Sequence, residues 1–490
     1  MKFLIITTII VLISSPLLYS QTVLDFDKYF ENATMRIDYY HIADAKSESI
    51  TLDKVYRQGI WAGSKKNLLD PFNQGRYYVK IYDHESEMLI YSKGFDSYCG
   101  EYRTTSSAKE GIQRTYHESA LIPFPKGKIK FTMESRDKKN ELKKFFSQVI
   151  DPGSVDIVKG DWIKDVKVYE AHTSGHPNAK VDIAIIGEGY TDREVFKFVE
   201  DIKRFTKIFF EQEPYKSRKE KFNIYGVLKY SDDSGTDEPR ANIYRSTILN
   251  TTFNSMGSAR YLLTEDNKSL RDIAAHVPYD AIFIMVNSKR YGGGGIYNFY
   301  LTFTTDNQWY EYVFLHEFGH SFAALADEYY TSSTAYDDFF PTGIEPLEPN
   351  ITALLDPENL KWKNFVTPGT EIPTPWEKEK YDEMDQKYQK KRREINDKIA
   401  KLKRELAPTE EIEKAEEESE SLSKNHAEKR DEYFAKSKFV GIVGAFEGAG
   451  YKSEDLYRPM LDCIMFSIGK KPFCKICENA IIKMIEYYSE

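Results

Sequence analysis

Three features of the sequence predict an α/β domain that follows an all-β domain and carries a helical insertion. Residues 22–155 contain short alternating segments between turns, and residues 156–490 contain apolar runs that alternate with helical patterns. Residues 376–436 interrupt this second region with charged, helix-like repeats. Strands that alternate with helices are typical of α/β domains. At 490 residues the chain is also too long for one ordinary domain.

The first 21 residues have the pattern of an export signal peptide, which is not part of the fold. Lys2 supplies the positive charge at the start, and residues 3–13 form the apolar stretch. Residues 18–20 form a candidate cleavage site before Gln21. The apolar stretch is short and polar residues break it, which favours cleavage over an uncleaved membrane anchor. We therefore expect a protein that is secreted, or exported to the periplasm or cell surface, with no membrane span after signal removal.

The N-terminal region, residues 22–155, has the sequence pattern of an all-β domain. Segments 33–40, 76–82 and 127–135 read as strands, and turn-rich stretches such as residues 70–75 separate them. This pattern predicts an antiparallel β-sandwich.

The α/β region begins with residues 181–187, a near-continuous apolar run of the kind that forms a strand buried on both faces. A helix is expected at 192–211 and a strand at 222–230. A second helix at 269–275 leads to a strand at 281–287. This alternation predicts an α/β catalytic domain.

Four consecutive glycines, residues 292–295, precede an expected edge strand at 296–304. Glycine permits unusual backbone angles, but the lysine and the helix of a phosphate-binding loop do not follow. Two interpretations stay open: an ordinary loop, or a flexible lip before an edge strand that pairs with an extended substrate backbone.

Residues 376–436 look like an inserted helical hairpin, with a possible turn at Pro408. Residues 377–406 hold 11 Lys/Arg against 8 Asp/Glu, whereas residues 409–436 hold 5 against 10. Two antiparallel helices of opposite charge would attract each other. A solvated helical arm is the favoured interpretation, and a partner-binding device is the alternative.

His316, Glu317 and His320 form the pattern H-E-x-x-H within an apolar helical segment. Residues four apart lie on one face of a helix, so the two imidazoles can hold one Zn²⁺ with the carboxylate beside it. A catalytic zinc takes three protein ligands and leaves one position to a water that it acidifies. The alternative, a core helix with two buried histidines, would bury Glu317 without a partner. We predict a zinc site with Glu317 as the general base.

These residues resemble the site of metzincin-type zinc peptidases, in which two helical histidines precede a helix break, a third ligand and a methionine turn. More closely, the sequence resembles the IgA-peptidase family of secreted zinc metallopeptidases. The resemblance implies a zincin-like α/β catalytic domain after a β-rich N-terminal domain. The matching segments are HEFGHSFA at 316–323, ADEY at 326–329, GEGYT at 187–191, YGGGG at 291–295, FEGAGY at 446–451, YRP at 457–459 and DCIM at 462–465.

The resemblance also implies that Asp327 is the third zinc ligand and that Met465 forms the floor beneath the metal. A continued helix would place Asp327 about 10 Å along the axis from His320, so the chain must turn back between them. Ala324 stands where the family usually has glycine, and a left-handed turn there costs about 1 kcal/mol. The turn can also fall elsewhere, and Glu328 stays open as an alternative ligand.

Four cysteines are few for an exported chain of this size, so the fold rests on cores and not on a disulfide frame. Cys99 is alone in the N-terminal half, while Cys463, Cys474 and Cys477 cluster near the end. One C-x-x-C with a single extra cysteine is a weak metal signal. A structural disulfide is expected there, with its partners undetermined.

The net charge of −9 and the pI near 5.7 argue against a nucleic-acid binder. The sequence predicts an exported zinc endopeptidase that hydrolyses protein or glycoprotein substrates through a zinc-activated water, with Glu317 as general base. Related sites suggest Tyr457 as a donor to the oxyanion, and the family name implies immunoglobulin A as one candidate substrate. The competing class is a non-catalytic exported protein that binds a glycan or protein and keeps a vestigial zinc site. Glu317 argues against that class, because a purely structural site needs no base.

Overall fold

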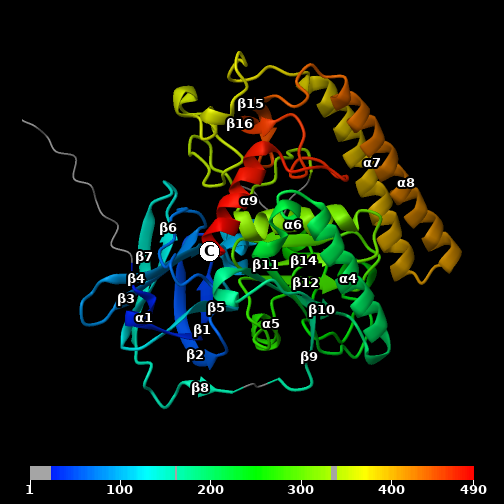
Figure 1. Ribbon diagram of the computed structural model, residues 1–490. Helices are drawn as coiled ribbons and strands as arrows, with labels where there is room; N and C mark the ends of the chain where they lie inside the picture. Colours follow the sequence, from blue (N-terminus) through cyan, green and yellow to red (C-terminus); the bar gives the residue numbers. More distant parts are fainter. Residues whose placement is uncertain (1–23, 161–162, 333–338, 490) are drawn as a thin grey trace, which may run out of the picture.

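The computed structural model describes residues 24–160, 163–332 and 339–489 of the chain (Figure 1). The expected signal peptide, residues 1–21, lies outside these residues. Among the helices that the structure describes, none combines the length and the apolar character needed to cross a bilayer. The chain forms a β-rich N-terminal unit, an α/β unit around a six-stranded sheet, and a C-terminal part with two long helices (Figure 1).

The N-terminal unit consists of two four-stranded sheets whose inner faces share one hydrophobic core. Ile37 and Ile122 of the first sheet meet Ile81 and Phe131 of the second in that core. The sheet orders are β5-β1-β2-β8 and β4-β3-β6-β7, and every pairing except β2 with β8 is antiparallel. Two sheets packed over one core form a β-sandwich. The strands are β1 (Phe30–Ala43), β2 (Glu48–Gln58), β3 (Tyr77–Asp83), β4 (Leu89–Phe95), β5 (Arg114–Pro125), β6 (Ile129–Arg136), β7 (Leu142–Ile150) and β8 (Val158–Lys159).

The α/β unit is built on a mixed sheet with the order β13-β14-β12-β10-β11-β9. The four inner strands are parallel to one another, and the two edge strands, β9 and β13, are antiparallel to their neighbours. Every residue of β10 is buried, as the apolar run at 181–187 predicts. The strands are β9 (Lys167–His172), β10 (Val181–Glu188), β11 (Phe222–Leu228), β12 (Ala281–Val286), β13 (Gly293–Ile296) and β14 (Tyr300–Thr304).

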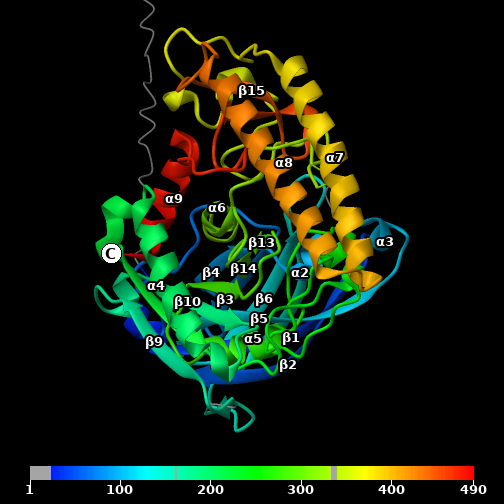
Figure 2. The ribbon, with the colours of Figure 1, turned by 90° about the vertical axis from the view of Figure 1, so that its right-hand side faces the viewer.

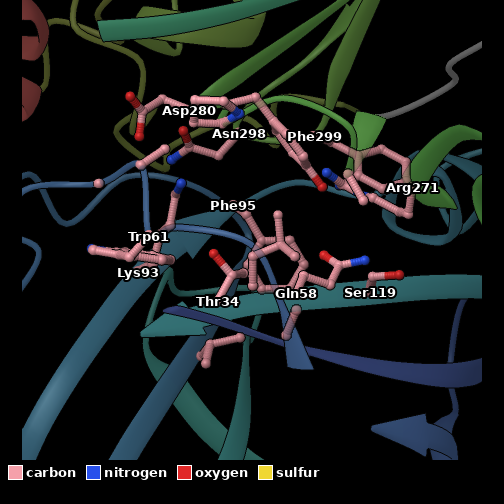
Figure 3. A pocket seen from close by; sticks show the side chains of 18 of the residues that line it. Thr34, Gln58, Trp61, Lys93, Phe95, Ser119, Arg271, Asp280, Asn298 and Phe299 are labelled. Carbon is pink, nitrogen blue, oxygen red and sulfur yellow. The ribbon is translucent and has the colours of Figure 1, made fainter. Parts of the chain in front are cut away.

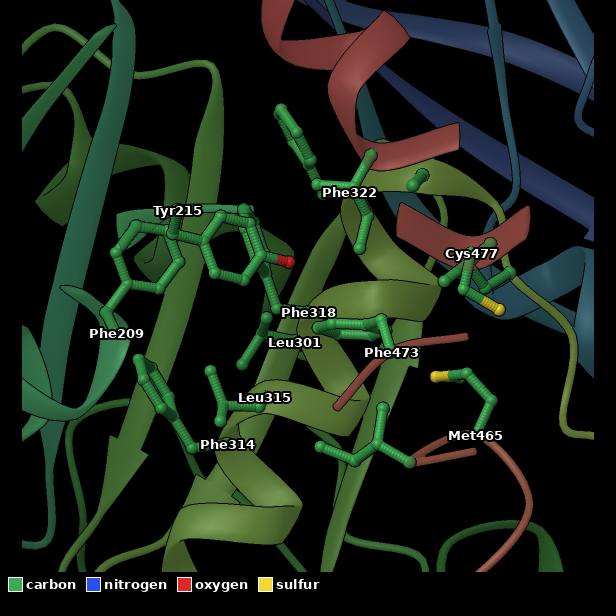
Figure 4. Packing of buried hydrophobic residues seen from close by; sticks show 14 of the residues in the cluster. Phe209, Tyr215, Leu301, Phe314, Leu315, Phe318, Phe322, Met465, Phe473 and Cys477 are labelled. Atoms are coloured by element: carbon green, nitrogen blue, oxygen red, sulfur yellow. The ribbon is translucent and has the colours of Figure 1, made fainter. Parts of the chain in front are cut away.

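Both faces of this sheet are covered, which is why its inner strands are apolar. On one face, Phe314 and Phe318 of α6 pack on Phe283 of β12, within a large aromatic core (Figure 4). On the other face, α5 and residues of the N-terminal unit, such as Tyr116, share a second core with Ile186. The helices of this unit are α4 (Val195–Glu211), α5 (Asn267–Ala274) and α6 (Tyr310–Ala323).

Three of the four glycines, residues 293–295, belong to the sheet and not to a lip in front of it. Gly293–Ile296 form β13 at the edge, and β14 lies inside, between β13 and β12. The prediction of one edge strand at 296–304 is therefore wrong, because a turn at residues 297–299 divides it. A Cβ on Gly295 would lie 2.5 Å from the carbonyl oxygen of Glu317. Only glycine lets β13 approach α6 this closely.

Helix α6 ends because Ala324 adopts the left-handed conformation, with φ 50° and ψ 36°. The N–H groups of Ala324 and Leu325 both donate to the carbonyl of Gly319, which closes the last turn. The reversal thus falls where the family usually has glycine, although this chain has alanine there. Strain of about 1 kcal/mol is the expected consequence.

The C-terminal part carries two 27-residue helices, α7 (Lys378–Arg404) and α8 (Thr409–Ala435), which lie side by side (Figures 1 and 2). Salt bridges of 3.3 Å from Lys398 to Glu418 and 2.9 Å from Lys403 to Glu416 join them in antiparallel register. Lys403 and Arg404 also reach residues 238–240 of the α/β unit, so the tip of the pair rests on that unit. The C-terminal part also contains the hairpin of β15 (Val443–Ala449) and β16 (Lys452–Met460), and helix α9 (Lys475–Tyr488). Three short helices, α1 (Phe26–Tyr29), α2 (Tyr98–Tyr102) and α3 (Ser106–Lys109), lie in the N-terminal unit.

Buried charges join the N-terminal unit to the α/β unit. The fully buried guanidinium of Arg36, on β1, bonds Asp38 at 2.6 Å and Asp272 of α5 at 2.5 Å. A buried charge is stable only when it is paired, so this contact needs both units. A cavity of 260 Å³ remains between them, with Lys93 and Asp280 in its wall (Figure 3).

The N-terminal unit also holds the turn between β13 and β14. The carbonyl of Tyr297 accepts from the N–H of Asp96 at 2.9 Å, and the side-chain amide of Asn298 donates to the carbonyl of Gly94 at 2.7 Å. The N-terminal unit therefore holds the end of β13, and α6 packs on the face of the same strand.

Replacing Ala324 with glycine should raise the free energy of unfolding by about 1 kcal/mol, because glycine adopts a left-handed conformation without Cβ strain. The neighbouring Ala323→Gly variant is the matched control. Ala323 is helical, so glycine there should destabilise the protein by about 1 kcal/mol. Urea unfolding at a fixed zinc concentration measures both changes. Shifts of the same sign in the two variants would contradict the left-handed assignment.

Replacing Asp272 with alanine should lower the free energy of unfolding by about 2 kcal/mol, because Arg36 then keeps a buried charge with one carboxylate fewer. Glu200→Ala removes an exposed salt bridge to Lys203 instead and should change stability by less than about 1 kcal/mol. Urea unfolding of the two variants gives the comparison. Equal, small losses would show that the Arg36 contact does not couple the units.

Candidate metal centre

His316 and His320 project from one face of α6 and bring their Nε2 atoms within 3.1 Å of each other. Each Nδ1 faces a backbone carbonyl: the distance is 3.0 Å from His316 to Ile464 and 2.5 Å from His320 to Leu325. A carbonyl oxygen only accepts hydrogen bonds, so it favours the tautomer with the proton on Nδ1. Each Nε2 lone pair is then directed to the shared centre, the arrangement that metal-binding histidines use.

Asp327 joins the two histidines because the chain reverses at Ala324. Its Oδ1 lies 3.1 Å from Nε2 of His316 and 3.2 Å from Nε2 of His320. The hydroxyl of Tyr451 donates to the other oxygen, Oδ2, at 2.5 Å. The structure therefore places all three ligand candidates around one point, with Oδ1 of Asp327 facing it.

The third-ligand segment, residues 324–329, is held by contacts from distant parts of the chain. The side chain of Asn350 bonds both the N–H and the carbonyl of Ala326, at 2.7 and 2.9 Å. The N–H of Gly450, in the β15–β16 turn, donates to the carbonyl of Asp327 at 3.0 Å. The position of the third ligand is thus set by tertiary contacts and not by helical periodicity.

The three ligand atoms fit a zinc ion. Tetrahedral zinc with ligand bonds of ~2.0 Å separates its ligand atoms by about 3.3 Å, and the separations here are 3.1, 3.1 and 3.2 Å. Oδ1 of Asp327 is buried and has no hydrogen-bond partner among the described residues, as suits a metal ligand. Two imidazoles and one carboxylate leave a fourth position open, which is the pattern of catalytic zinc sites.

The electrostatics of the site favour positive charge at its centre. Burial opposes a charged imidazole, but Asp327 beside it raises the pKa of His320 to about 9. Burial also opposes ionisation of Asp327, yet the two imidazoles hold the pKa of its carboxyl well below the usual range. A proton and a metal ion compete for this centre, because ligands bind metal in the deprotonated form.

Met465 lies beneath α6, where the resemblance places the floor of the site. A Cβ on Gly319 would lie 2.9 Å from the sulfur of Met465, which is fully buried (Figure 4). The turn that carries Met465 also supports the ligands. The carbonyl of Ile464 faces Nδ1 of His316, and the carbonyl of Met465 accepts from the N–H of Glu328 at 2.8 Å.

The ligand atoms open onto a cavity of 940 Å³ between the α/β unit and the N-terminal unit. Glu317 lines this cavity, and a Cβ on Gly293 would lie 3.0 Å from its Oε1. The carboxylate therefore lies against the edge strand β13, in the same cavity as the ligand group. Burial raises the pKa of Glu317, which makes the carboxylate a better proton acceptor. The N-terminal unit contributes Arg76, Arg103, Ser135, Arg136 and Lys138 to the opposite wall.

Glu328 does not face this centre, and the expected disulfide is wrong. Oε1 of Glu328 lies 3.3 Å from Sγ of Cys477 and 3.9 Å from Sγ of Cys474. Cys463, Cys474 and Cys477 are free thiols, and the Sγ atoms of Cys463 and Cys477 are 3.9 Å apart. A disulfide requires ~2.05 Å. The fold spreads the three sulfurs around a carboxylate instead of pairing two of them.

Tyr457 is not among the described residues that line the cavity. It lies in β16, where it pairs with Glu447, and its backbone bonds Thr352. Two other tyrosines, Tyr329 and Tyr451, line the cavity next to the ligand group. The structure therefore separates Tyr457 from the remaining site residues.

Sequence reasoning missed Arg260, Tyr329 and Tyr451 as members of the site. Nη2 of Arg260 donates to the hydroxyl of Tyr329 at 2.8 Å, and both residues line the cavity. Tyr329 is the last residue of the ADEY segment and Tyr451 the last of FEGAGY. Both segments match the family, so the resemblance could have indicated these two tyrosines as site residues. No pattern in the sequence marks Arg260, which reaches the site from the loop before α5.

Two family models match this chain. The model described as IgA Peptidase M64 matches residues 169–485, and the one described as Peptidase M64 N-terminus matches residues 25–147. A search among curated proteins gives no match. The first family model alone covers more than half of the 490 residues. The chain therefore belongs to the IgA peptidase M64 family.

Proposed function

We propose that this protein is an exported zinc-dependent endopeptidase that hydrolyses peptide bonds of protein or glycoprotein substrates. The observation that carries the proposal is the triangle of ligand atoms from His316, His320 and Asp327, with Glu317 beside it in one cavity. Three ligands and an adjacent base are the groups that a zinc hydrolase needs, and a structural site has no use for the base. Membership in a peptidase family supports the same class of reaction. The signal pattern in residues 1–21 supports export.

Glu317 is the proton carrier in this proposal. A zinc ion held by the three ligands would polarise the substrate carbonyl and acidify water. Glu317 accepts the proton of the attacking water and delivers it to the leaving amine. Its carboxylate lies against β13 at Gly293.

The substrate backbone, in this proposal, runs along β13. Edge strands bind extended peptides by adding a strand, and β13 is the sheet edge nearest to α6. Gly294 and Gly295 line the cavity and carry no side chain that would keep a peptide away. The carbonyl of Gly293 already accepts from the N–H of Leu262 at 3.3 Å. Neighbouring residues of an antiparallel strand point their backbone groups to opposite sides, so Gly294 faces β14 and Gly295 presents the outward groups that a peptide can bond. An internal peptide segment fits this arrangement, which favours an endopeptidase.

Tyr329 is the proposed donor to the oxyanion, in place of Tyr457. Its hydroxyl accepts from Arg260 at 2.8 Å, which leaves its own proton free to donate into the cavity. The guanidinium of Arg260 makes that proton a stronger donor. Arg260 positions and polarises Tyr329 and does not have to touch the substrate itself.

Glu317→Gln should lower kcat by roughly 10²–10⁴-fold and leave the zinc content unchanged, because the amide cannot accept the proton. Glu311→Gln, on the same helix but paired with Lys470, is the matched control and should keep wild-type activity. The measurement is proteomic identification of cleavage sites in a mixed protein library that includes immunoglobulin A, with and without a chelator. Cleavage by Glu317→Gln at the wild-type rate would refute the mechanism. A wild-type protein that cleaves nothing but binds a library member would support the binding-protein class instead.

Tyr329→Phe should lower kcat by roughly 10²-fold with a smaller change in KM, because an oxyanion donor acts mainly in the transition state. Tyr457→Phe should behave as wild type, since Tyr457 does not line the cavity. Steady-state kinetics on a peptide taken from an identified cleavage site separates kcat from KM. A larger loss of kcat in Tyr457→Phe than in Tyr329→Phe would identify Tyr457 as the oxyanion donor instead.

A further inference from the structure

Directly behind the metal centre, four buried side chains from three parts of the chain converge. Glu328 comes from the third-ligand segment, Cys463 precedes the turn of Met465, and Cys474 and Cys477 belong to the start of α9. One potential ligand atom of each lies within 4.8 Å of all the others. Figure 4 shows Cys477 and Met465 on the same side of the helix that carries Phe318 and Phe322.

The distances in this group match those around tetrahedral zinc. Zinc with Zn–S bonds of ~2.3 Å and a Zn–O bond of ~2.1 Å separates two sulfurs by about 3.8 Å, and a sulfur from the oxygen by about 3.6 Å. The Sγ atoms of Cys463 and Cys477 are 3.9 Å apart. Oε1 of Glu328 lies 3.3 Å from Sγ of Cys477 and 3.9 Å from Sγ of Cys474.

The surroundings favour negatively charged ligands. The N–H groups of Met465 and Cys474 both donate to Sγ of Cys463, at 3.4 and 3.2 Å. Cys474 is the N-cap of the 14-residue helix α9, whose positive end favours thiolates. Oε2 of Glu328 is buried without a hydrogen-bond partner among the described residues. A carboxylate in that position is costly unless a cation compensates it.

A disulfide does not account for this group. Three thiols cannot all pair with one another, and the fourth, Cys99, lies in the N-terminal unit. Cys99 has its own neighbours, His41 and Glu118. That group offers no metal site, because both ring nitrogens of His41 already bond carboxylates, at 3.0 Å to Glu118 and 3.2 Å to Glu48.

We propose that Glu328, Cys463, Cys474 and Cys477 bind a second, structural zinc ion. Thiolates select soft metals over calcium or magnesium, and four protein ligands close the coordination sphere. This ion links the third-ligand segment, the methionine turn and α9. It therefore supports the catalytic ligands from behind and takes no part in hydrolysis, so the inference does not depend on the proposed peptidase activity.

Metal analysis of purified protein tests the proposal. The wild type should contain two zinc ions per chain, and the double variant His316→Ala/His320→Ala should retain one. Cys477→Ser should lose one ion relative to wild type, whereas the control Cys99→Ser should keep both. The double histidine variant leaves the thiol group intact, so it keeps the test valid if Cys477→Ser fails to fold.

Cobalt substitution identifies which site is occupied. Cobalt bound by thiolates gives intense near-ultraviolet charge-transfer absorption, which a site of histidines and a carboxylate lacks. This absorption should persist in the double histidine variant and disappear in Cys477→Ser. If the double histidine variant retains this absorption, the result supports a thiolate site even when the protein shows no peptidase activity.

Two outcomes would overturn the second zinc site. One is a single zinc ion in the wild type and none in the double histidine variant. The other is that alkylation of the unfolded, unreduced protein adds alkyl groups to two of the four cysteines instead of all four. The second outcome would show that two of the three clustered cysteines are paired, which leaves too few ligands.

Discussion

An α-helix presents two histidines on one face, but it cannot bring a third ligand to the same metal, because each residue advances the chain by 1.5 Å along the axis. Asp327 reaches Nε2 of His316 and His320 only because the chain reverses at Ala324, in a conformation that alanine rarely adopts. Contacts that form only in the folded protein maintain this reversal, from Asn350 and from the β15–β16 turn. The position of Asp327 beside the two histidines therefore depends on these tertiary contacts.

The N-terminal β-sandwich contributes to the site and does not merely precede it. It holds the turn between β13 and β14 through the backbone of Tyr297 and the side chain of Asn298, and it forms one wall of the cavity. Gly295 allows β13 to lie against the backbone of Glu317. A shift of the sandwich would therefore move the edge strand relative to the carboxylate of Glu317, which couples the domain interface to the proposed substrate path.

Two clusters of ligand-type residues share the same short segments. Asp327 faces the histidines and Glu328 faces the cysteines, so neighbouring residues point to opposite sides of one strand-like segment. Cys463 and Met465 also point to different clusters. Cys463 belongs to the thiol group, and Met465 lies under Gly319. Because these segments are common to both clusters, the packing of the thiol group constrains the positions of Asp327 and Met465.

The sequence by itself determined what depends on local spacing. The helical pair His316 and His320, with the carboxylate of Glu317 beside it, follows from helical spacing, and the buried strand at 181–187 follows from its near-continuous apolar run. The family match covers both units of the chain. Only the tertiary structure decided which of Asp327 and Glu328 faces the histidines, that the clustered cysteines are unpaired, and that Tyr329 and not Tyr457 lines the cavity. These outcomes depend on contacts between residues more than a hundred positions apart, such as Glu328 with Cys477, and no local pattern encodes such contacts.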